Sequence, residues 1–495
     1  MRLPRSPCAI LVVTALGAVL RVAWIHSRLL ADEVVTQTLA AASWSDFWGY
    51  LQLENTPPLF FLMARWWMQL VPLTEAWTHL LPLLIGTIAI PLSFVVARKV
   101  LAIVPSLLVA VLVAVSTPFL TESLEFRTYP LTAVLMLTYV LTFLHWVNHP
   151  TWRRLWTIAL IAVVGLYSHL QFGLVLVAAT MTVLTTRTLR TRWRSWLVTT
   201  GAAVASVIPW LVFVLADRAA TIVGPAWWSG LSPSRISQFA NWIGAFFPLW
   251  FNRDFNNVLT GLGLAALVVL AVATFVQRSS LRQPPLLIVF SAWLVVTGIL
   301  AALVANVTVP KYFIVVFPGL YLLVAFAWAR LHPRALAHGL LGVFLATLLI
   351  VNTTTKHRGD WLPALQYLRP RLTADTLVLA HPNLESIVIR YYLPEATIMP
   401  MLPSRYWTAD RFRDLLRYNF QRVITPESVN DLATMTEGYD TVWFVSAVVP
   451  RPDFFNTHLP LQWFSDHGWD GELISDFQWD GLYLVRFDRP SFIAR

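Results

Sequence analysis

The chain has 495 residues, of which 57% are hydrophobic and only 13% are charged, and its mean hydropathy is +0.62. This composition excludes an ordinary soluble enzyme and indicates a protein that crosses a membrane several times. The net charge of +10 does not indicate a nucleic-acid partner, because most basic residues stand in short clusters between apolar runs, where they orient helices and meet anionic lipid headgroups.

The first apolar run, within MRLPRSPCAILVVTALGAVLRVAWIH (1–26), contains the single cysteine, Cys8. One cysteine excludes a disulfide within the chain and a cysteine-based zinc site. The run is too long for a secretory signal peptide and no clear cleavage site follows it. We therefore expect an uncleaved first membrane span.

Long apolar runs predict about eleven transmembrane helices. They lie near 8–26, 79–97, 100–118, 128–147, 155–169, 170–186, 195–216, 258–276, 286–305, 312–330 and 335–351. The shorter run PPLFFLMARWWMQLVP (57–72) carries Arg65 and is flanked by prolines, so we expect a helix lying flat in the membrane interface. The basic clusters then all fall on one side, which is cytoplasmic by the positive-inside rule, and the acidic loops fall on the outer side.

After Val351 the long apolar runs stop. Four β-rich pieces, TLVLA (376–380), ATIMPM (396–401), TVWFVSA (441–447) and GLYLVRF (481–487), alternate with helical pieces such as NLESIVIRYYL (383–393). We expect a transmembrane core over 1–351, with a first external loop at 27–78, and a soluble α/β domain over 352–495 outside the cytoplasm. The sequence shows no internal repeat, which disfavours a transporter because many transporters contain repeated halves.

Asp32 and Glu33 follow directly on the first predicted span. Acidic residues favour the start of a helix, so one interpretation is that they cap an interfacial helix, VVTQTLAAASW (34–44). The other is that one carboxylate is a general base in a partly dehydrated cleft, while its neighbour holds a cation or a hydroxyl group. Position alone leaves both interpretations open.

A second acidic loop, TPFLTESLEFRTYPL (117–131), stands between two predicted spans and contains Glu122, Glu125, Arg127 and Tyr129. Glu125 and Arg127 are two residues apart, so on a helix they would reach different partners. One interpretation is a surface ion pair before a helix that starts near Pro130. The other assigns Arg127 to an anionic group and Glu125 to a sugar or to catalytic positioning.

Two further outer turns carry polar candidates. GLYSHLQFG (165–173) contains Tyr167, Ser168 and His169, although a lone histidine there is more often a packing group than a catalyst. VTVPKYF (307–313) places Lys311 and Tyr312 just outside the membrane, a common interfacial arrangement. Because Lys311 is the only lysine expected in the outer loops of the membrane domain, we favour phosphate capture. No nucleotide-binding motif occurs in a suitable context, so a transferred group would come from a lipid-borne donor.

Together these segments resemble the bacterial members of glycosyltransferase family 39, the protein mannosyltransferase-like group of the GT-C superfamily. The resemblance covers most of 10–330 and lies in ADE (31–33), TPPLFF (56–61), SLEFRTYPL (123–131), YSHLQFG (167–173) and PKYFIVVFPGLYLL (310–323). GDWLPALQYLRPRL (359–372) resembles the opening of the soluble domain of such proteins. The resemblance implies a GT-C-like, polytopic α-helical membrane fold with interfacial helices, a polyprenyl-phosphate sugar donor, and transfer with inversion at the anomeric carbon.

The resemblance also implies roles for particular residues. The catalytic base of the first-loop motif maps onto Asp32, with Glu33 beside it, and the acid and base of the second loop map onto Glu125 and Arg127. Relatives often have histidine where this chain has Thr56, so any ligand role of that histidine is absent here.

Donor phosphate and substrate binding is expected from Arg127, Lys311, Tyr312, Tyr129 and His169. Relatives commonly carry arginine before tyrosine where this chain has Lys311, so its phosphate contact would be monodentate. The expected reaction does not require a cofactor. If a divalent cation binds, we expect it at Asp32 and Glu33.

We therefore expect a multi-pass cell-membrane hexosyl- or pentosyltransferase with an extracytoplasmic active site. Its partners would be the lipid bilayer, a polyprenyl-phosphate sugar donor and a glycan, lipid or protein acceptor, with no nucleic acid. The alternatives are a lipid-linked-sugar transporter and a polysaccharide polymerase or ligase of the cell envelope. A transporter should distribute ionisable residues inside its spans, whereas here they collect at one surface.

Overall fold

The structure of the protein is a computed structural model. It describes residues 5–54, 56–218, 269, 285–305, 310–354, 361–406, 409–417, 424–447, 456–474 and 482–489. The predicted span near 258–276, apart from residue 269, lies outside the described residues. Contacts divide the chain into two compact units. The helical unit contains the described residues of 1–26, 56–213 and 228–357, and the sheet unit contains those of 27–55, 214–227 and 358–495.

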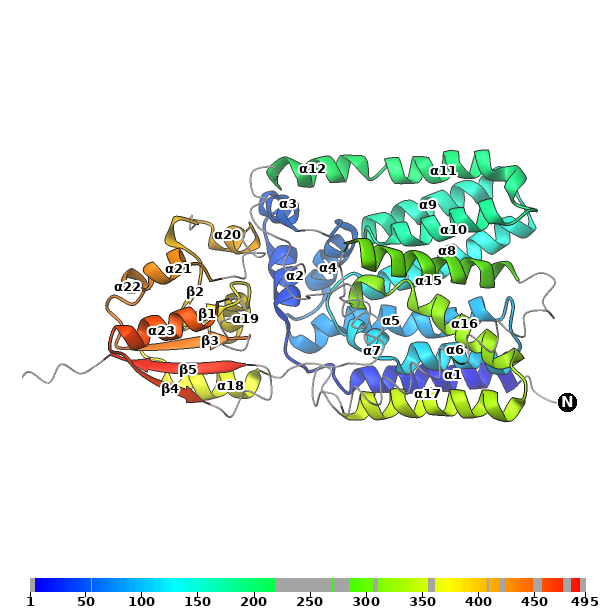
Figure 1. Ribbon diagram of the computed structural model, residues 1–495. Coiled ribbons are helices and arrows are strands. Elements are labelled where there is room, and N and C mark those ends of the chain that lie inside the picture. The colour runs from blue at the N-terminus through cyan, green and yellow to red at the C-terminus, as the bar shows by residue number, and fades with distance from the viewer. Residues whose placement is uncertain are drawn as a thin grey trace, which may run out of the picture. The chain divides into compact units, whose positions relative to one another are not determined.

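The helical unit is built from helices that cover every predicted span within the described residues (Figure 1). They are α1 (Arg5–Val22), α4 (Leu59–Leu70), α5 (Glu75–Ala97), α6 (Ile103–Val115), α7 (Thr117–Glu122), α8 (Tyr129–Asn148), α9 (Trp152–Ser168), α10 (Phe172–Thr185), the 3₁₀ turn η1 (Arg190–Arg192), α11 (Trp193–Ala205), the first half of α12 (Ile208–Arg218), α15 (Leu286–Ala305), the 3₁₀ turn η3 (Pro310–Phe313), α16 (Phe317–Arg330) and α17 (Arg334–Thr354).

Three stretches among the described residues are long and apolar enough to cross a membrane: Glu75–Ala97, Tyr129–Asn148 and Arg190–Ala216. Shorter apolar helices, such as α6 and α10, accompany them. A bilayer requires about 20 apolar residues for each helical crossing. These helices therefore place the protein in a membrane, while the number of eleven spans stays a prediction.

The amphipathic helix α4 corresponds to the run that was predicted to lie flat. Its 12 residues extend about 18 Å at ~1.5 Å per residue, which is well short of the ~30 Å hydrocarbon core. Phe60, Phe61 and Ala64 are buried, whereas Trp66 and Leu70 are 63% and 79% exposed. A helix with one packed face and one exposed aromatic and aliphatic face suits the membrane interface.

The antiparallel course of the helices sorts the loops of this unit between two ends. The basic clusters lie where α5 ends (Arg98 and Lys99), where α9 begins (Arg153 and Arg154) and after α10 (Arg187 to Arg194). The loops at 116–128, 169–171 and 310–316 connect the opposite ends of the same helices. The loop at 116–128 (the acidic loop), the turn at 169–171 (the histidine turn) and the turn at 310–316 (the lysine turn) therefore share one end of the bundle.

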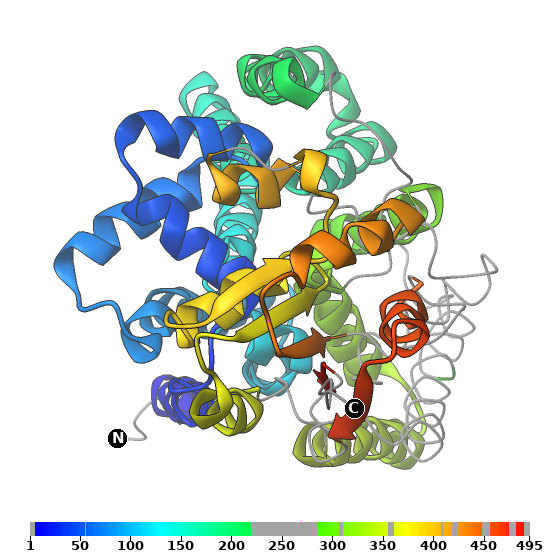
Figure 2. The same ribbon diagram turned by 90° about the vertical axis from the view of Figure 1, so that its left-hand side faces the viewer.

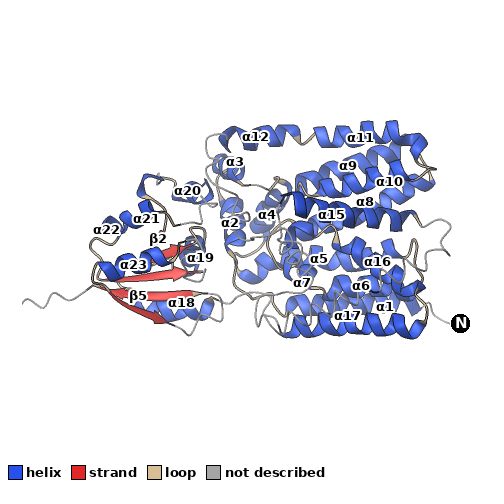
Figure 3. Ribbon diagram, in the orientation of Figure 1, coloured by secondary structure: helices blue, strands red, loops and turns tan. Residues whose placement is uncertain are grey.

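The sheet unit contains a five-stranded sheet among its described residues, with the order β2-β1-β3-β5-β4 (Figures 2 and 3). The strands are β1 (Thr376–His381), β2 (Thr397–Pro400), β3 (Thr441–Ser446), β4 (Asp470–Ile474) and β5 (Tyr483–Asp488). β1 is parallel to both β2 and β3, whereas β5 is antiparallel to β3 and β4. All four predicted strands are present, and β4 is an additional strand.

Helices cover both faces of the sheet. They are α18 (Leu362–Leu368), η4 (Arg369–Arg371), α19 (Glu385–Tyr392), η5 (Ser404–Tyr406), α20 (Arg411–Arg417), α21 (Pro426–Asn430), α22 (Leu432–Met435) and α23 (His458–Asp466). Tyr367 of α18 contacts Trp443 on one face, and Phe464 of α23 stacks on Phe487 on the other. These two contacts lie on opposite faces because Trp443 pairs with Arg486, and the neighbouring residue Phe487 points to the other side of the sheet.

Two helices from the first loop belong to this same unit. They are α2 (Ala31–Ala41) and α3 (Trp44–Leu53). α2 packs against α19, and α3 packs against α20. The first acidic pair is therefore carried by the body that contains the C-terminal sheet.

Candidate functional site

The acidic loop between α7 and α8 is buried despite its charges. Glu122, Glu125 and Arg127 are only 8%, 5% and 5% exposed. The backbone turns tightly here, because the N–H of Arg127 donates to the carbonyl oxygen of Glu125 at 2.6 Å. Phe126 packs edge-to-face on Phe60 of α4, with 5.6 Å between the ring centroids. The loop thus presents its charged side chains from a fixed backbone.

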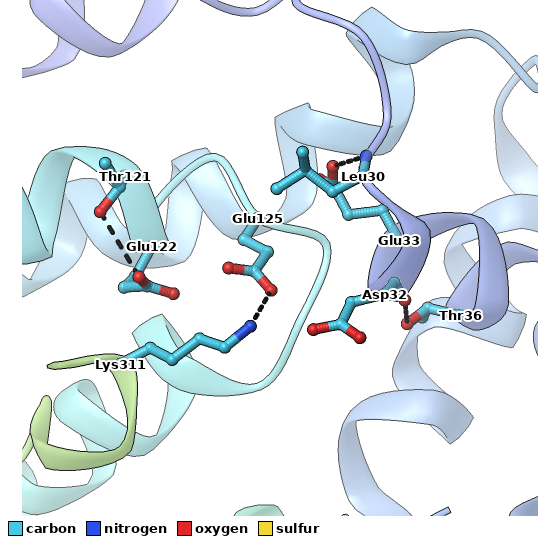
Figure 4. A network of polar contacts seen from close by, with 8 residues as sticks. All are labelled: Leu30, Asp32, Glu33, Thr36, Thr121, Glu122, Glu125 and Lys311. Atoms are coloured by element: carbon cyan, nitrogen blue, oxygen red, sulfur yellow. Dashed lines mark hydrogen bonds and ion pairs between the residues drawn. The ribbon is translucent and has the colours of Figure 1, made fainter. Parts of the chain in front are cut away.

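Lys311 and Glu125 form an ion pair across 186 residues of sequence (Figure 4). The Nζ of Lys311 donates to Oε1 of Glu125 at 2.9 Å, and the two side chains are 19% and 7% exposed. The same ammonium group lies 5.4 Å from the centroid of the Tyr129 ring. In surroundings with little water, the carboxylate and the aromatic face both stabilise the charged form of the lysine.

Three aromatic side chains predicted from separate motifs come together beside this ion pair. The ring of His169 lies 5.7 Å from that of Tyr129 and 6.2 Å from that of Tyr312, and the two tyrosine rings are 6.3 Å apart. The Nδ1 of His169 accepts a hydrogen bond from the N–H of Gln171 at 3.2 Å, so a neutral ring carries its proton on Nε2.

Burial, and to a smaller extent the positive charges of Arg127 and Lys311, together lower the pKa of His169 to about 4. The imidazole is therefore neutral near pH 7 and adds no third positive charge to this cluster. A neutral imidazole between two tyrosine rings offers one N–H donor and a flat face to a ligand.

A network of hydroxyl groups fixes the histidine turn to the start of α8. Thr128 Oγ1 donates to the carbonyl oxygen of Ser168 at 2.9 Å, and the Ser168 hydroxyl lies 2.6 Å from Thr128 Oγ1 and 2.9 Å from Thr132 Oγ1. All three residues are buried. Tyr167, one residue earlier, donates its hydroxyl to the carbonyl oxygen of Ser206 at 2.8 Å. Tyr167 and Ser168, both noted from the sequence, therefore have structural contacts.

Arg21 holds the other end of the acidic loop, and sequence reasoning did not select it. Its buried guanidinium group donates through Nη1 to the carbonyl oxygen of Ala114 at 3.0 Å, and through Nη2 to those of Val113 at 3.2 Å and Phe119 at 3.3 Å. The carbonyls of Val113 and Ala114 belong to the last turn of α6, where a helix end lacks backbone donors, and that of Phe119 belongs to α7. The only signal in the sequence is an arginine enclosed by apolar residues near the end of the first span.

Gly86 of α5 lets the acidic loop approach closely. A Cβ atom at this position would lie 2.1 Å from Oγ and 2.6 Å from Cβ of Ser123, which precedes Glu125 by two residues. Only glycine therefore fits this contact without displacing the loop.

The first acidic pair stands in the first turn of α2, in the sheet unit. Glu33 is fully buried, and its Oε2 accepts a hydrogen bond from the N–H of Leu30 at 2.6 Å (Figure 4). Glu33 therefore does help to cap the helix, but the helix spans Ala31–Ala41 and not the expected 34–44, so the acidic pair lies within its first turn. Asp32 is half-buried, and its carbonyl oxygen accepts the hydroxyl of Thr36 at 2.9 Å. Its carboxylate is favoured in this position by the helix dipole.

A metal centre is not apparent in the part of the chain that the structure describes. No group of three or more His, Cys, Asp or Glu side chains there is arranged so that it could hold a metal ion.

Comparisons with known proteins identify the fold. No protein-family model matches the chain, and no curated protein matches its sequence. The solved structure of ArnT from Cupriavidus metallidurans in the apo state covers 97% of both chains, with 14% identity and a TM-score of 0.57. The same protein bound to undecaprenyl phosphate gives a TM-score of 0.57 at 13% identity, again over 97% of both chains.

The oligosaccharyltransferase from Archaeoglobus fulgidus, tethered to an acceptor peptide containing the NVT sequon, is similar over 94% of this chain and 73% of its own, with 12% identity and a TM-score of 0.50. Such low identities establish the fold alone. The chain therefore shares the fold of ArnT and of this oligosaccharyltransferase, which agrees with the polytopic fold that the sequence resemblance implied.

We predict that Gly86→Ala displaces the acidic loop and destabilises the protein. The added methyl group meets Ser123, and overpacking of this kind costs about 1–3 kcal/mol. Thermal unfolding in detergent measures the effect. Gly201→Ala in α11 is the matched control, because no described atom lies within 4 Å of the added carbon. Equal melting temperatures for the two variants would contradict the proposed close contact.

We also predict a pH-dependent contribution of His169 to stability. Its folded pKa of about 4 lies below the usual 6.5, so protonation favours the unfolded state and stability is lost as pH falls from 6.5 towards 4. Between pH 7.5 and 5.0 the wild type should lose about 1–2 kcal/mol more than His169→Gln. Unfolding measured at both pH values tests this expectation, and parallel losses in the two proteins would refute it.

Proposed function

We propose that this protein is an inverting glycosyltransferase that moves a sugar from a polyprenyl-phosphate carrier to an acceptor hydroxyl on the extracytoplasmic side of the membrane. The observation that supports this proposal most is the partly buried ion pair of Lys311 and Glu125, with Arg127 in the same buried loop. Cationic groups held at the loop end of an apolar helical bundle suit a ligand with an anionic head and an isoprenoid tail. The fold shared with ArnT, which has been solved with undecaprenyl phosphate, agrees with this donor.

Lys311 and Arg127 are proposed to bind the donor phosphate. When the bond between the sugar and the phosphate breaks, negative charge grows on the phosphate that leaves. Fixed cations stabilise this charge more strongly in a site with little water than they would in bulk solvent. The ammonium of Lys311 has three N–H donors, so its bond to Glu125 is compatible with a phosphate oxygen as a further acceptor. Glu125 would then orient the lysine and keep it charged.

Asp32 is proposed to act as the general base. It would accept the proton of the acceptor hydroxyl as the oxygen attacks the anomeric carbon from the side opposite the phosphate, so that the configuration inverts. A positioned base contributes about 10²–10⁴-fold to the rate. The Glu33 carboxylate accepts from the Leu30 N–H, which supports a role in holding α2 rather than in proton transfer.

The aromatic group of Tyr129, His169 and Tyr312 is proposed to form part of the substrate site. Its rings lie within 6.3 Å of one another and adjoin the Lys311 ammonium. Flat rings beside a cation would contact the apolar face of the sugar or the first isoprene unit, while the cation contacts the phosphate.

The role of Asp32 is tested by transfer assays with a polyprenyl-phosphate sugar. Asp32→Asn and Asp32→Ala should lower kcat at least 100-fold, because both remove the proton acceptor. Asp46→Asn is a matched control, since Asp46 also lies in the first turn of a first-loop helix but is exposed. Wild-type kcat in either Asp32 variant would remove Asp32 from this role.

The role of Lys311 is tested by comparing a single with a double substitution. Lys311→Met should weaken the binding of undecaprenyl phosphate about 10- to 150-fold, the range expected for one charged hydrogen bond. If the lysine only neutralised Glu125, adding Glu125→Gln would restore binding. We expect the double variant to remain weak, and restored affinity would instead assign Lys311 a purely structural role.

A further inference from the structure

The part of the first loop that belongs to the sheet unit, 27–54, is anchored to the C-terminal part of that unit both before α2 and near the end of α3. Before α2, the N–H of Leu29 donates to the hydroxyl oxygen of Tyr392 at 2.9 Å, and the guanidinium carbon of Arg28 lies 4.3 Å from the ring centroid of Trp361. Near the end of α3, Tyr50 packs edge-to-face on Phe412, with 4.8 Å between the centroids. These contacts join residues more than 300 positions apart.

The Tyr392 contact bears directly on where α2 begins. The N–H of Leu29 is held by Tyr392, and the next N–H along the chain, that of Leu30, is held by Glu33. Both hydrogen bonds fix the backbone immediately before the first helical turn, in which Asp32 is the second residue. The backbone three residues before Asp32 is therefore held by the hydroxyl of a residue at the end of α19.

Tyr392 is itself held in place by the opening segment of the C-terminal domain. Its carbonyl oxygen accepts a hydrogen bond from Arg369 in η4, and Arg369 also forms an ion pair with Glu395 at 3.2 Å. α19 packs along α2 and against β1 and β2. The tyrosine therefore connects the sheet to the start of α2 through a chain of direct contacts.

We propose that Tyr392 is a positioning residue for Asp32, so that the C-terminal domain sets the geometry of the reaction's general base. This inference rests on the proposed function of Asp32. It assigns the sheet a part in catalysis through the backbone of the first loop, without requiring that any residue of the sheet contact the substrate.

The first test removes a single oxygen atom. Tyr392→Phe should lower kcat about 3- to 20-fold, the effect of one hydrogen bond, while KM for the donor changes less than twofold. Tyr391→Phe is the matched control, because it removes a hydroxyl from the adjacent, exposed residue of the same helix and should leave kcat unchanged. Size-exclusion and thermal-unfolding profiles should be the same for both variants.

A double-mutant cycle separates positioning from a general structural effect. If Tyr392 acts through Asp32, adding Tyr392→Phe to Asp32→Asn should not lower the residual single-turnover rate further. An equal fractional loss in both backgrounds would overturn the proposal, as would a wild-type kcat in Tyr392→Phe itself.

A second readout does not depend on activity. In a Cys8→Ser background, which removes the only native cysteine, Asp32→Cys places a thiol at the position of the base. We expect Tyr392→Phe to change the rate of thiol alkylation by a maleimide at least threefold, and to leave the rate at an Asp46→Cys reporter unchanged. An unchanged rate at Asp32→Cys would refute the anchoring. If Asp32→Asn retained full activity, the proposed role of Asp32 would fail, while the alkylation result would still decide the positioning.

Discussion

The guanidinium group of Arg21 is the contact on which the acidic loop of the helical unit depends. The last turn of a helix leaves carbonyl oxygens without backbone donors, and inside a bilayer no water can replace those donors. Arg21 supplies N–H groups to Val113, Ala114 and Phe119 at once, at the junction of α6 and α7. A buried charge is costly unless it is hydrogen-bonded, and these carbonyl oxygens accept hydrogen bonds from both Nη atoms of the guanidinium group. The direction of the chain as it enters the loop follows from this contact.

Other contacts hold the acidic loop against α5 and hold the start of α8 against the histidine turn. Gly86 lets Ser123 lie directly against α5, while Thr128, Thr132 and Ser168 join the start of α8 to the histidine turn. The charged side chain of Glu125 thus extends from a backbone that is fixed independently of its ion pair with Lys311. Such support is what a preorganised electrostatic site requires, because the charges then need not reorganise when a ligand's charge develops.

Much of the fold follows from local sequence patterns. Apolar runs located the helices, and the β-rich pieces at 376–380 and 441–447 located β1 and β3, since both signals come from neighbouring residues. β4 was missed because DGELI combines a glycine with acidic residues, and as an exposed edge strand it needs no apolar face. The sequence also predicted that Glu33 could cap a helix, as one of two interpretations of the acidic pair.

The contacts that build the site could not be predicted from the sequence in the same way. Glu125 and Lys311 were each predicted as site residues from their own motifs, but no local spacing indicates that they pair across 186 residues. Arg21 looked like an ordinary residue at the end of a span, and its carbonyl partners carry no side-chain signal. Likewise, α2 and α3 follow a membrane span in the sequence, and only three-dimensional contacts assign them to the unit that contains the sheet.

The sheet unit is discontinuous along the chain, and this has a consequence for biosynthesis. About 300 residues separate its first segment, which ends at 55, from the segment that begins at 358. At roughly 5–20 residues per second, α2 and α3 leave the ribosome roughly 18–70 s before their partners α19 and α20. During that interval Tyr50 of α3 lacks Phe412 of α20, on which it packs in the folded protein. Nascent chains arrested before residue 358 should therefore be favoured substrates of chaperones and quality-control proteases.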